Sequence, residues 1–374
     1  MRGSTTTPPE GRVSHETRPS HTASLRNRAS ARLAWLAKWA RFLGQRLLGV
    51  AVVLFAVATI TFFVTRLLGT PVALLVGNTQ TRAAIKAARQ KLGLNEPLYV
   101  QYWHFLSQII HGNLGTSTHT FNPVSTDIIQ RLPVTFELVA VSMLLAIIVG
   151  GSLGIASAFS KWRGPDMIGQ TVAQVAMSVP SFWLGLILVL IFFAKLNVLP
   201  APLGQLDPGI SPPKTITGIM IVDCLLAGDM AALDNALKHL ILPAITLSLV
   251  SIPSILQITR NTCLEILKSD HVRTARAYGL RSGTILRSYV LRNAIAPIAV
   301  VIAMSFGFEM SGTVLVEEVF SWPGLGLYAV DSLNSQDYQP IIALVLLCAL
   351  FYAASYLLAD IISAAADPRV RLGG

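Results

Sequence analysis

The sequence predicts an all-α membrane protein with six transmembrane helices. Of its 374 residues, 53% are hydrophobic and only 13% are charged, whereas a soluble domain carries about 25% charged residues. Six apolar segments approach the length of about 20 residues with which a helix crosses the hydrocarbon core. Because lipid offers no hydrogen bonds, the backbone groups of such segments must be satisfied within a helix. The alternating segments of about ten residues that are typical of a β-barrel do not dominate this chain.

Lysine and arginine indicate the orientation of the chain. If the N-terminus lies inside, the inner segments are residues 1–46, 160–166, 260–292 and 366–374. They hold about 20 of the 29 Lys and Arg, against about six of the 19 Asp and Glu, which is the bias expected of cytoplasmic segments. We therefore expect both termini in the cytoplasm. The net charge of +10 follows from this bias and does not indicate binding of nucleic acid.

The N-terminal region precedes the first apolar segment. Residues 1–30 are rich in Ser, Thr, Pro and Arg and have almost no large apolar side chains, so they are predicted to form a disordered cytoplasmic tail. Residues 31–46 have helical periodicity, with apolar residues on one side and several cationic residues, as in an amphipathic helix at the membrane surface. Alternatively, they are the first turns of the first transmembrane helix.

The transmembrane domain is predicted to span residues 47–374. Its six apolar segments are residues 46–66, 138–160, 167–194, 239–259, 293–316 and 338–359. Pro243 and Pro253 remove backbone hydrogen bonds from the fourth segment, so we expect that helix to bend. The outer loops, residues 69–133 and 195–238, are long and contain three helical stretches, at 82–91, at 101–111 and from about 217. Such loops either bind an external partner or cover the helix bundle.

The inner loop, residues 260–292, contains the most informative stretch of the chain. In the sequence DHVRTARAYGLRSGTILRSYVLRNAIAP, Asp270 can begin a helix and Gly279 can end it. Between them lie cationic and small residues: Arg273, Thr274, Ala275, Arg276 and Ala277. Small residues permit close approach to a partner, and arginines pair with carboxylates through two hydrogen bonds. The same pattern is compatible with a basic loop that lies on anionic lipid headgroups.

Glu309 interrupts the fifth apolar segment. A carboxylate in the hydrocarbon core is costly unless it is paired or hydrated, and Ser305, Ser311 and Thr313 are close enough in sequence to assist it. The functional interpretation is that Glu309 lines a translocation path and binds an amine of the substrate. The alternatives are a polar contact with a partner subunit and a position near the outer interface.

Motifs for catalysis and metal binding are absent from the sequence. There is no GxxxxGK[ST] phosphate loop, no nucleophile elbow and no HExxH helix, so we expect neither ATP hydrolysis nor other enzymatic activity in this chain. Cys224, Cys263 and Cys348 are scattered singly, and His104 and His111 belong to an outer loop. We therefore expect no cofactor and no metal site in the chain itself.

The inner loop resembles the cytoplasmic coupling loop, the EAA-type motif, of ABC importer permeases. RTARAYGL…LRNAIAP is close to the form found in the dipeptide, oligopeptide and nickel permeases. The resemblance covers residues from about 46 to the C-terminus, and the order of further motifs strengthens it: LGLNEPLYVQYWHFL, HGNLGTS, RLPVTFELV, SVPSFWLGL, HLILPAITLSL, EEVFSWPGLG and DPRVR. The long first outer loop resembles that of the B-type subunit. Departures from the pattern are Thr274 for Glu, Tyr278 for Lys, His271 for Tyr and Gln257 for Arg.

The resemblance implies a type I ABC importer permease in the cytoplasmic membrane of a bacterium. It implies a second homologous permease subunit, two cytosolic ATPases that bind ATP and Mg, and an extracytoplasmic substrate-binding protein. The substrate would be a di- or oligopeptide, with nickel as the alternative, and residues 270–279 would form the helix that receives the ATPase stroke.

Two other classes of protein compete with this interpretation. An ion-coupled secondary transporter would need inverted repeats or buried ion-binding carboxylates, for which Glu309 is the one candidate. A membrane-embedded enzyme would need a convergent catalytic set, and the sequence indicates none.

Overall fold

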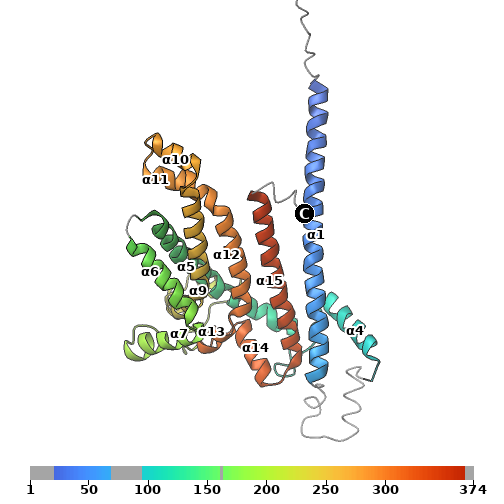
Figure 1. Cartoon of the computed structure of the whole chain (residues 1–374). Coiled ribbons are helices and arrows are strands. Elements are labelled where there is room, and N and C mark those ends of the chain that lie inside the picture. Colours follow the sequence, from blue (N-terminus) through green and yellow to red (C-terminus); the bar gives the residue numbers. More distant parts are fainter. Residues whose placement is uncertain (1–20, 69–94, 161–162, 367–374) are drawn as a thin grey trace, which may run out of the picture.

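The computed structural model describes residues 21–68, 95–160 and 163–366. These residues form helices and connecting segments without a β-strand, apart from an isolated bridge between Thr116 and Pro123. Figure 1 shows long helices side by side, some upright and some oblique, with short helices at both ends of the bundle. The all-α prediction is thus confirmed.

Among the described residues, five helical segments are long and apolar enough to cross a membrane. They lie in α1 (His21–Leu68), α5 (Val124–Phe159), α9 (Met230–Leu267), α15 (Tyr338–Ala366) and the run Ser282–Gly312. That run consists of α11 (Ser282–Thr284), the π-helical η2 (Ile285–Leu291) and α12 (Arg292–Gly312). A sixth span results if one bent pair of helices counts as a single crossing.

The bent pair contains residues 167–194, which we expected as one crossing. It consists of α6 (Arg163–Ser178), α7 (Ser181–Leu188) and the π-helical η1 (Val189–Lys195), with a bend of 103°. The break falls at Val179–Pro180. Proline disfavours the helical conformation of the residue before it and cannot continue the hydrogen-bond ladder, so the second half starts in a new direction.

Within the described ranges, five short helices lie outside the spans. They are α4 (Leu98–Ile110), α8 (Met220–Ala227), α10 (Asp270–Ala277), α13 (Val314–Val319) and α14 (Leu325–Asn334). Helix α4 matches the stretch predicted at 101–111, and α8 matches the one expected from about 217. The stretch predicted at 82–91 lies outside the described residues.

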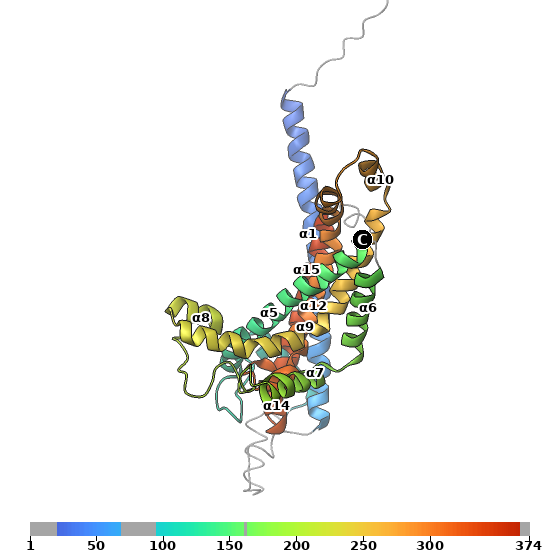
Figure 2. The same ribbon diagram turned by 90° about the vertical axis from the view of Figure 1, so that its left-hand side faces the viewer.

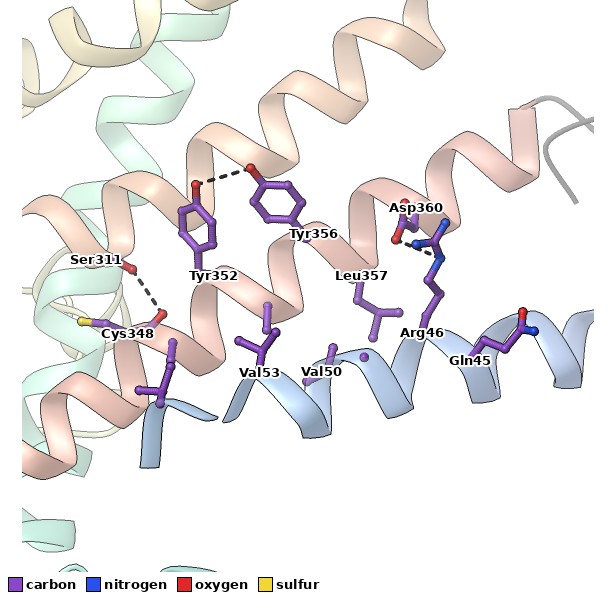
Figure 3. Close-up of a pocket in the computed structure, with 14 residues that line it drawn as sticks. Gln45, Arg46, Val50, Val53, Ser311, Cys348, Tyr352, Tyr356, Leu357 and Asp360 are labelled. Atoms are coloured by element: carbon purple, nitrogen blue, oxygen red, sulfur yellow. Dashed lines mark hydrogen bonds and ion pairs between the residues drawn. The ribbon is translucent and has the colours of Figure 1, made fainter. Parts of the chain in front are cut away.

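Helix α1 is continuous through residues 31–46. The structure therefore has no separate surface helix there, and residues 21–30, expected to be disordered, form the first turns of α1. No proline interrupts His21–Leu68, and Ala, Leu and Arg are strong helix formers. Helix α1 packs beside α15, where Arg46 Nε lies 3.2 Å from Asp360 Oδ2 (Figure 3). The predicted tail residues 1–20 lie outside the described residues.

Helix α9 also stays unbroken through Pro243 and Pro253. Figure 2 shows that it changes direction along its length, which agrees with the bend expected from the two prolines. The start of α1, the end of α15 and α10 lie toward one end of the bundle, and α14 lies at the other (Figure 1). The described ends of the chain therefore share a side with α10.

Two glycines bring α5 and α9 into close contact. A Cβ added at Gly150 would lie 3.0 Å from the carbonyl oxygen of Ile252, and one at Gly154 would lie 2.8 Å from that of Leu256. The two glycines are four residues apart, so they share a face of α5, as in the small-residue motifs of membrane helix pairs. Buried Met143, Ala146, Ile252 and Ile255 complete the contact.

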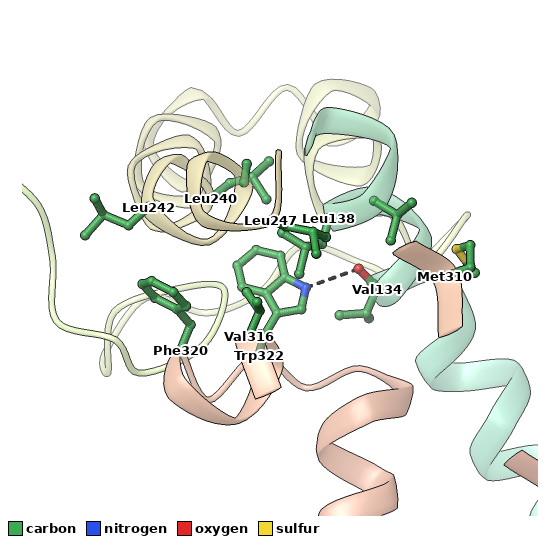
Figure 4. Close-up of a cluster of buried hydrophobic side chains, with 11 residues drawn as sticks. Val134, Leu138, Leu240, Leu242, Leu247, Met310, Val316, Phe320 and Trp322 are labelled. Atoms are coloured by element: carbon green, nitrogen blue, oxygen red, sulfur yellow. Dashed lines mark hydrogen bonds between the residues drawn. The ribbon is translucent and has the colours of Figure 1, made fainter. Parts of the chain in front are cut away.

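The end of the bundle that holds α14 has its own core around Trp322. The indole Nε1 donates a hydrogen bond to the carbonyl oxygen of Val134 at 3.1 Å, and the ring lies among side chains of α5, α9 and α13 (Figure 4). Glu317, fully buried, accepts hydrogen bonds from Thr135 Oγ1 at 2.8 Å and from the backbone N–H of Gly326 at 2.7 Å. Burial raises the pKa of Glu317, and its hydrogen bonds only partly oppose that rise. The SWPGLG turn is thus fixed to α5.

The close approach of α5 and α9 makes a direct prediction. Gly154→Val should lower the thermal stability of the purified protein in detergent, because overpacking a tight contact costs about 1–3 kcal/mol. Gly151→Val is the matched control, since a Cβ at Gly151 meets no atom within 4 Å. Equal unfolding temperatures for the two variants would contradict the packing described here.

Candidate functional site

Helix α10 is attached to the transmembrane helices by its buried face. Val272 and Ala275 are buried against Cys263 of α9, Ile285 and Val290 of η2 and Ala294 of α12. The residues on either side of α10 in the chain are the end of α9 and the start of α11. A force applied to α10 therefore acts directly on α9 and on η2, which continues into α12.

The ends of α10 are well defined. Ser269, not Asp270, occupies the N-cap position, and Asp270 lies in the first turn, where a negative charge favours the helix dipole. At the other end, Gly279 has a φ of +75°. Its N–H donates to the carbonyl of Arg276 at 2.9 Å, and the N–H of Leu280 donates to that of Ala275 at 3.2 Å. This is the Schellman arrangement that the left-handed conformation of glycine permits, so the predicted role of Gly279 agrees with the structure.

The exposed face of α10 is cationic and carries one aromatic side chain. Arg273, Thr274, Arg276 and Ala277 are exposed, and Tyr278 is 83% exposed. Ala275, which we expected to permit close approach of a partner, faces inward instead. The periodicity of a helix places Val272 and Ala275 on one face, three residues apart, and that face is the one buried here.

An ion pair between α6 and α9, close to the loop that contains α10, was not expected from the sequence. Arg260 of α9 holds Asp166 of α6 through two hydrogen bonds, Nε to Oδ1 at 2.6 Å and Nη2 to Oδ2 at 3.0 Å. The two-hydrogen-bond geometry fixes α6 to α9 next to the inner loop. The opposite charges at the ends of two predicted apolar segments were the signal available in the sequence.

Glu309 faces the interior of this chain. Its side chain is 1% exposed and accepts a hydrogen bond from Ser142 Oγ of α5 at 2.5 Å, with Ser251 of α9 as a second interacting hydroxyl. The expected helper Ser311 instead donates to the carbonyls of Gly307 and Cys348. Glu309 Oε1 has no hydrogen-bond partner in the described part of the chain. In this conformation, the carboxyl group joins α12 to α5 and α9.

Two further carboxylates order the outer connection that precedes α9. Asp223 accepts hydrogen bonds from the backbone N–H groups of Ile216, Thr217 and Gly218 at 2.8–3.2 Å. Burial acts to raise the pKa of Asp223, but these hydrogen bonds outweigh it, so the pKa lies below its usual value. Glu137, for which the sequence suggested no particular role, accepts from the N–H of Ile221 at 2.7 Å and so caps α8.

Metal ligands do not gather in the described ranges. No group of three or more His, Cys, Asp or Glu residues there is placed to hold a metal ion. His104 and His111 both lie exposed, His104 on α4 and His111 directly after it.

Two family profiles match the chain. One is described as binding-protein-dependent transport system inner membrane component and matches residues 131–372. The other describes the N-terminal part of such a membrane component and matches residues 39–139. Together they cover the described membrane-spanning helices.

Curated relatives match nearly the whole chain. A probable D,D-dipeptide transport system permease of Escherichia coli strain K12 is 38% identical over 333 residues, which are 89% of this chain and 98% of the relative. A dipeptide transport system permease of Alkalihalophilus pseudofirmus is 34% identical over 87% of this chain and 98% of its own length. A glutathione transport system permease of Salmonella choleraesuis is 35% identical over 87% of this chain and 97% of its own length.

The buried Asp223 makes a pH-dependent prediction. Asp223→Asn should destabilise the protein by about 1–3 kcal/mol at pH 7, because three backbone N–H groups lose a charged acceptor. Because the pKa of Asp223 is lower in the folded than in the unfolded state, its ionised form stabilises the fold at pH values above the unfolded pKa of about 3.9. This stabilisation is lost as the pH falls through the folded-state pKa. The difference between wild type and variant should therefore shrink below about pH 4 in thermal unfolding measurements. The exposed Asp234→Asn is the control, and a pH-independent difference would contradict this account.

Proposed function

Because the chain belongs to the family of binding-protein-dependent transport system inner membrane components, we propose a mechanism in which its helices import short peptides across a bacterial inner membrane. The chain is a permease subunit of an ABC importer of the dipeptide and oligopeptide family. The printed names of the three relatives specify a D,D-dipeptide, a dipeptide and glutathione, so they favour a peptide over nickel as the substrate.

The observation that supports the mechanism is that α10 has one buried apolar face and one exposed cationic face. One face is buried on α9 and η2, and the other presents Arg273, Arg276 and Tyr278 to a partner. We assign this exposed face to an acidic groove of a cytosolic ATPase subunit, with which the arginines can form charge-assisted hydrogen bonds. ATP and Mg would be bound by two such subunits, since this chain has no phosphate loop.

The motion of the ATPases would be transmitted to the transmembrane helices through packed contacts. When ATP draws the ATPases together, α10 moves and takes with it the ends of α9 and α12 that hold it. A second, homologous permease would supply the other half of the path, and a substrate-binding protein would dock on the outer loops. Because coupling between sites is reciprocal, a loaded binding protein that favours one state should raise ATPase activity.

Glu309 is the proposed polar group of the path. Its hydrogen bond to Ser142 spans two helices that the stroke would move relative to each other. Separation of α5 from α12 would free the carboxylate to meet the amino group of a peptide. A purely structural role, as a link between helices, is the competing interpretation, and the two roles give different kinetics.

Charge reversal on the exposed face of α10 tests the coupling role. Arg276→Glu should lower recovery of the ATPase subunits with the solubilised permease at least tenfold, which corresponds to a loss of about 1.4 kcal/mol. Peptide uptake should fall in parallel, while membrane insertion persists. Lys195→Glu makes the same charge change at the exposed end of η1. Ala275→Glu is a poor test because it would place a charge in a buried position.

Unchanged ATPase recovery and uptake in Arg276→Glu would contradict the assignment of α10. Uptake that survives ATP depletion but is abolished by an ionophore would instead establish an ion-coupled transporter.

Substitution of Glu309 separates its two proposed roles. If the carboxylate binds the substrate amine, Glu309→Gln should raise KM for peptides with a free amino group at least tenfold and leave an N-acetylated peptide unaffected, as measured by uptake into proteoliposomes of the assembled importer. Unfolding temperatures of the same samples serve as the control. Equal KM values for wild type and variant would assign Glu309 a structural role.

A further inference from the structure

A slot between α1 and α15 takes no part in the proposed function. It has a volume of about 660 Å³ and lies between two membrane-spanning helices (Figure 3). Its walls are mostly apolar, with Val50, Val53 and Val57 on α1 facing Ala353 and Leu357 on α15. Tyr352 and Tyr356 also line it, and their hydroxyl groups lie 3.4 Å apart, so each has a polar neighbour.

The dimensions of the slot restrict its occupant. On α1 the lining runs from Gln45 to Val57, a length of about 18 Å at the helical rise of 1.5 Å per residue. This is close to the depth of one leaflet, half of the roughly 30 Å hydrocarbon core. A lipid acyl chain spans the same depth, so the length of the slot matches that of one acyl chain.

The two ends of the slot differ in polarity. At the end nearer the start of α1, Gln45 and Arg46 of α1 and Asp360 of α15 line it. Arg46 and Asp360 form an ion pair and are 49% and 36% exposed, so this end is open to polar groups. At the other end the lining is Val57, Cys348 and Ser311, and the Ser311 hydroxyl already donates within the protein. An occupant that fits both ends is an amphiphile.

Free cations continue the lining stripe beyond its polar end. Lys38 and Arg41 precede Gln45 by seven and four residues, so they lie on the same face of α1. Both side chains are exposed, and neither forms an ion pair with a described residue. Clusters of cations beside an apolar groove attract anionic lipid headgroups, each cation contributing a factor of about five in affinity.

From these features we propose that the slot binds one anionic phospholipid, from the leaflet on the side of α10. An acyl chain lies between Val53 and Tyr352, and the phosphate lies near Arg41 and Lys38. Helix α1 contacts α15 and α4 in the described structure, and the lipid fills the slot that remains between α1 and α15. A lipid of the same length without net charge would lack the headgroup contacts.

The test measures lipid binding to the full-length chain, purified with its transport partners in mild detergent. Native mass spectrometry follows titration with phosphatidylglycerol, and phosphatidylcholine serves as the zwitterionic comparison. We expect one tightly bound phosphatidylglycerol per chain and at least tenfold weaker phosphatidylcholine. The double variant Lys38→Gln/Arg41→Gln should bind phosphatidylglycerol about 25-fold more weakly, about fivefold for each charge removed. Lys195→Gln should bind it as the wild type does.

A second variant tests the slot itself. Val53→Trp places a large ring in the slot and should abolish tight binding of phosphatidylglycerol, whereas Val52→Trp, at a neighbouring exposed position outside the lining, should not. Equal affinity for the two lipids, or wild-type binding by the double charge variant, would overturn the proposal. So would a photo-crosslinker at Val53 that labels a second permease subunit instead of lipid.

Discussion

Close contact between α5 and α9 is the constraint on which the rest of the bundle depends. Gly150 and Gly154 let the backbones approach so closely that a methyl group would collide with the carbonyls of α9. Helix α9 leads directly into α10, and α10 packs on α9 and on η2, which continues into α12. Glu309 of α12 in turn reaches Ser142 of α5. The inner loop, the central helix pair and the intramembrane carboxylate therefore form one connected set of contacts.

Three buried carboxylates order the end of the bundle that holds α8 and α14, and they do so through the same kind of hydrogen bond. Glu137, Asp223 and Glu317 each accept hydrogen bonds from backbone N–H groups at or before the start of a short helix. Burial of a carboxylate without partners costs free energy, but hydrogen bonds from backbone N–H groups offset part of that cost and fix the position of the chain. The outer loops thereby become an ordered surface on a helix bundle, which suits a face that meets an external protein. At the other end of the bundle, α10 packs on apolar side chains and the Arg260–Asp166 ion pair joins α6 to α9.

The sequence was sufficient for the features that depend on composition and periodicity. The apolar segments predicted the positions of the spans, because the backbone of a chain in lipid must form helices. Gly279 predicted the end of α10, because a left-handed backbone conformation favours glycine. Features that depend on a partner helix were missed or misplaced. Their prediction requires knowledge of which helices are in contact. Examples are the inward orientation of Ala275, the Arg260–Asp166 ion pair and the hydrogen bond from Ser142 to Glu309. The spacing of Gly150 and Gly154 was visible in the sequence, but its partner was not.

The central claim is that α10 touches an ATPase, and a crosslink from its exposed side chain tests this most directly. A photoreactive phenylalanine derivative at Tyr278, which is 83% exposed, would be activated in native membranes that contain the assembled importer. The mechanism predicts an adduct with a nucleotide-binding subunit, with a yield that changes when ATP is added. Adducts with phospholipid alone would contradict it and would show that the inner loop is a basic segment lying on lipid headgroups.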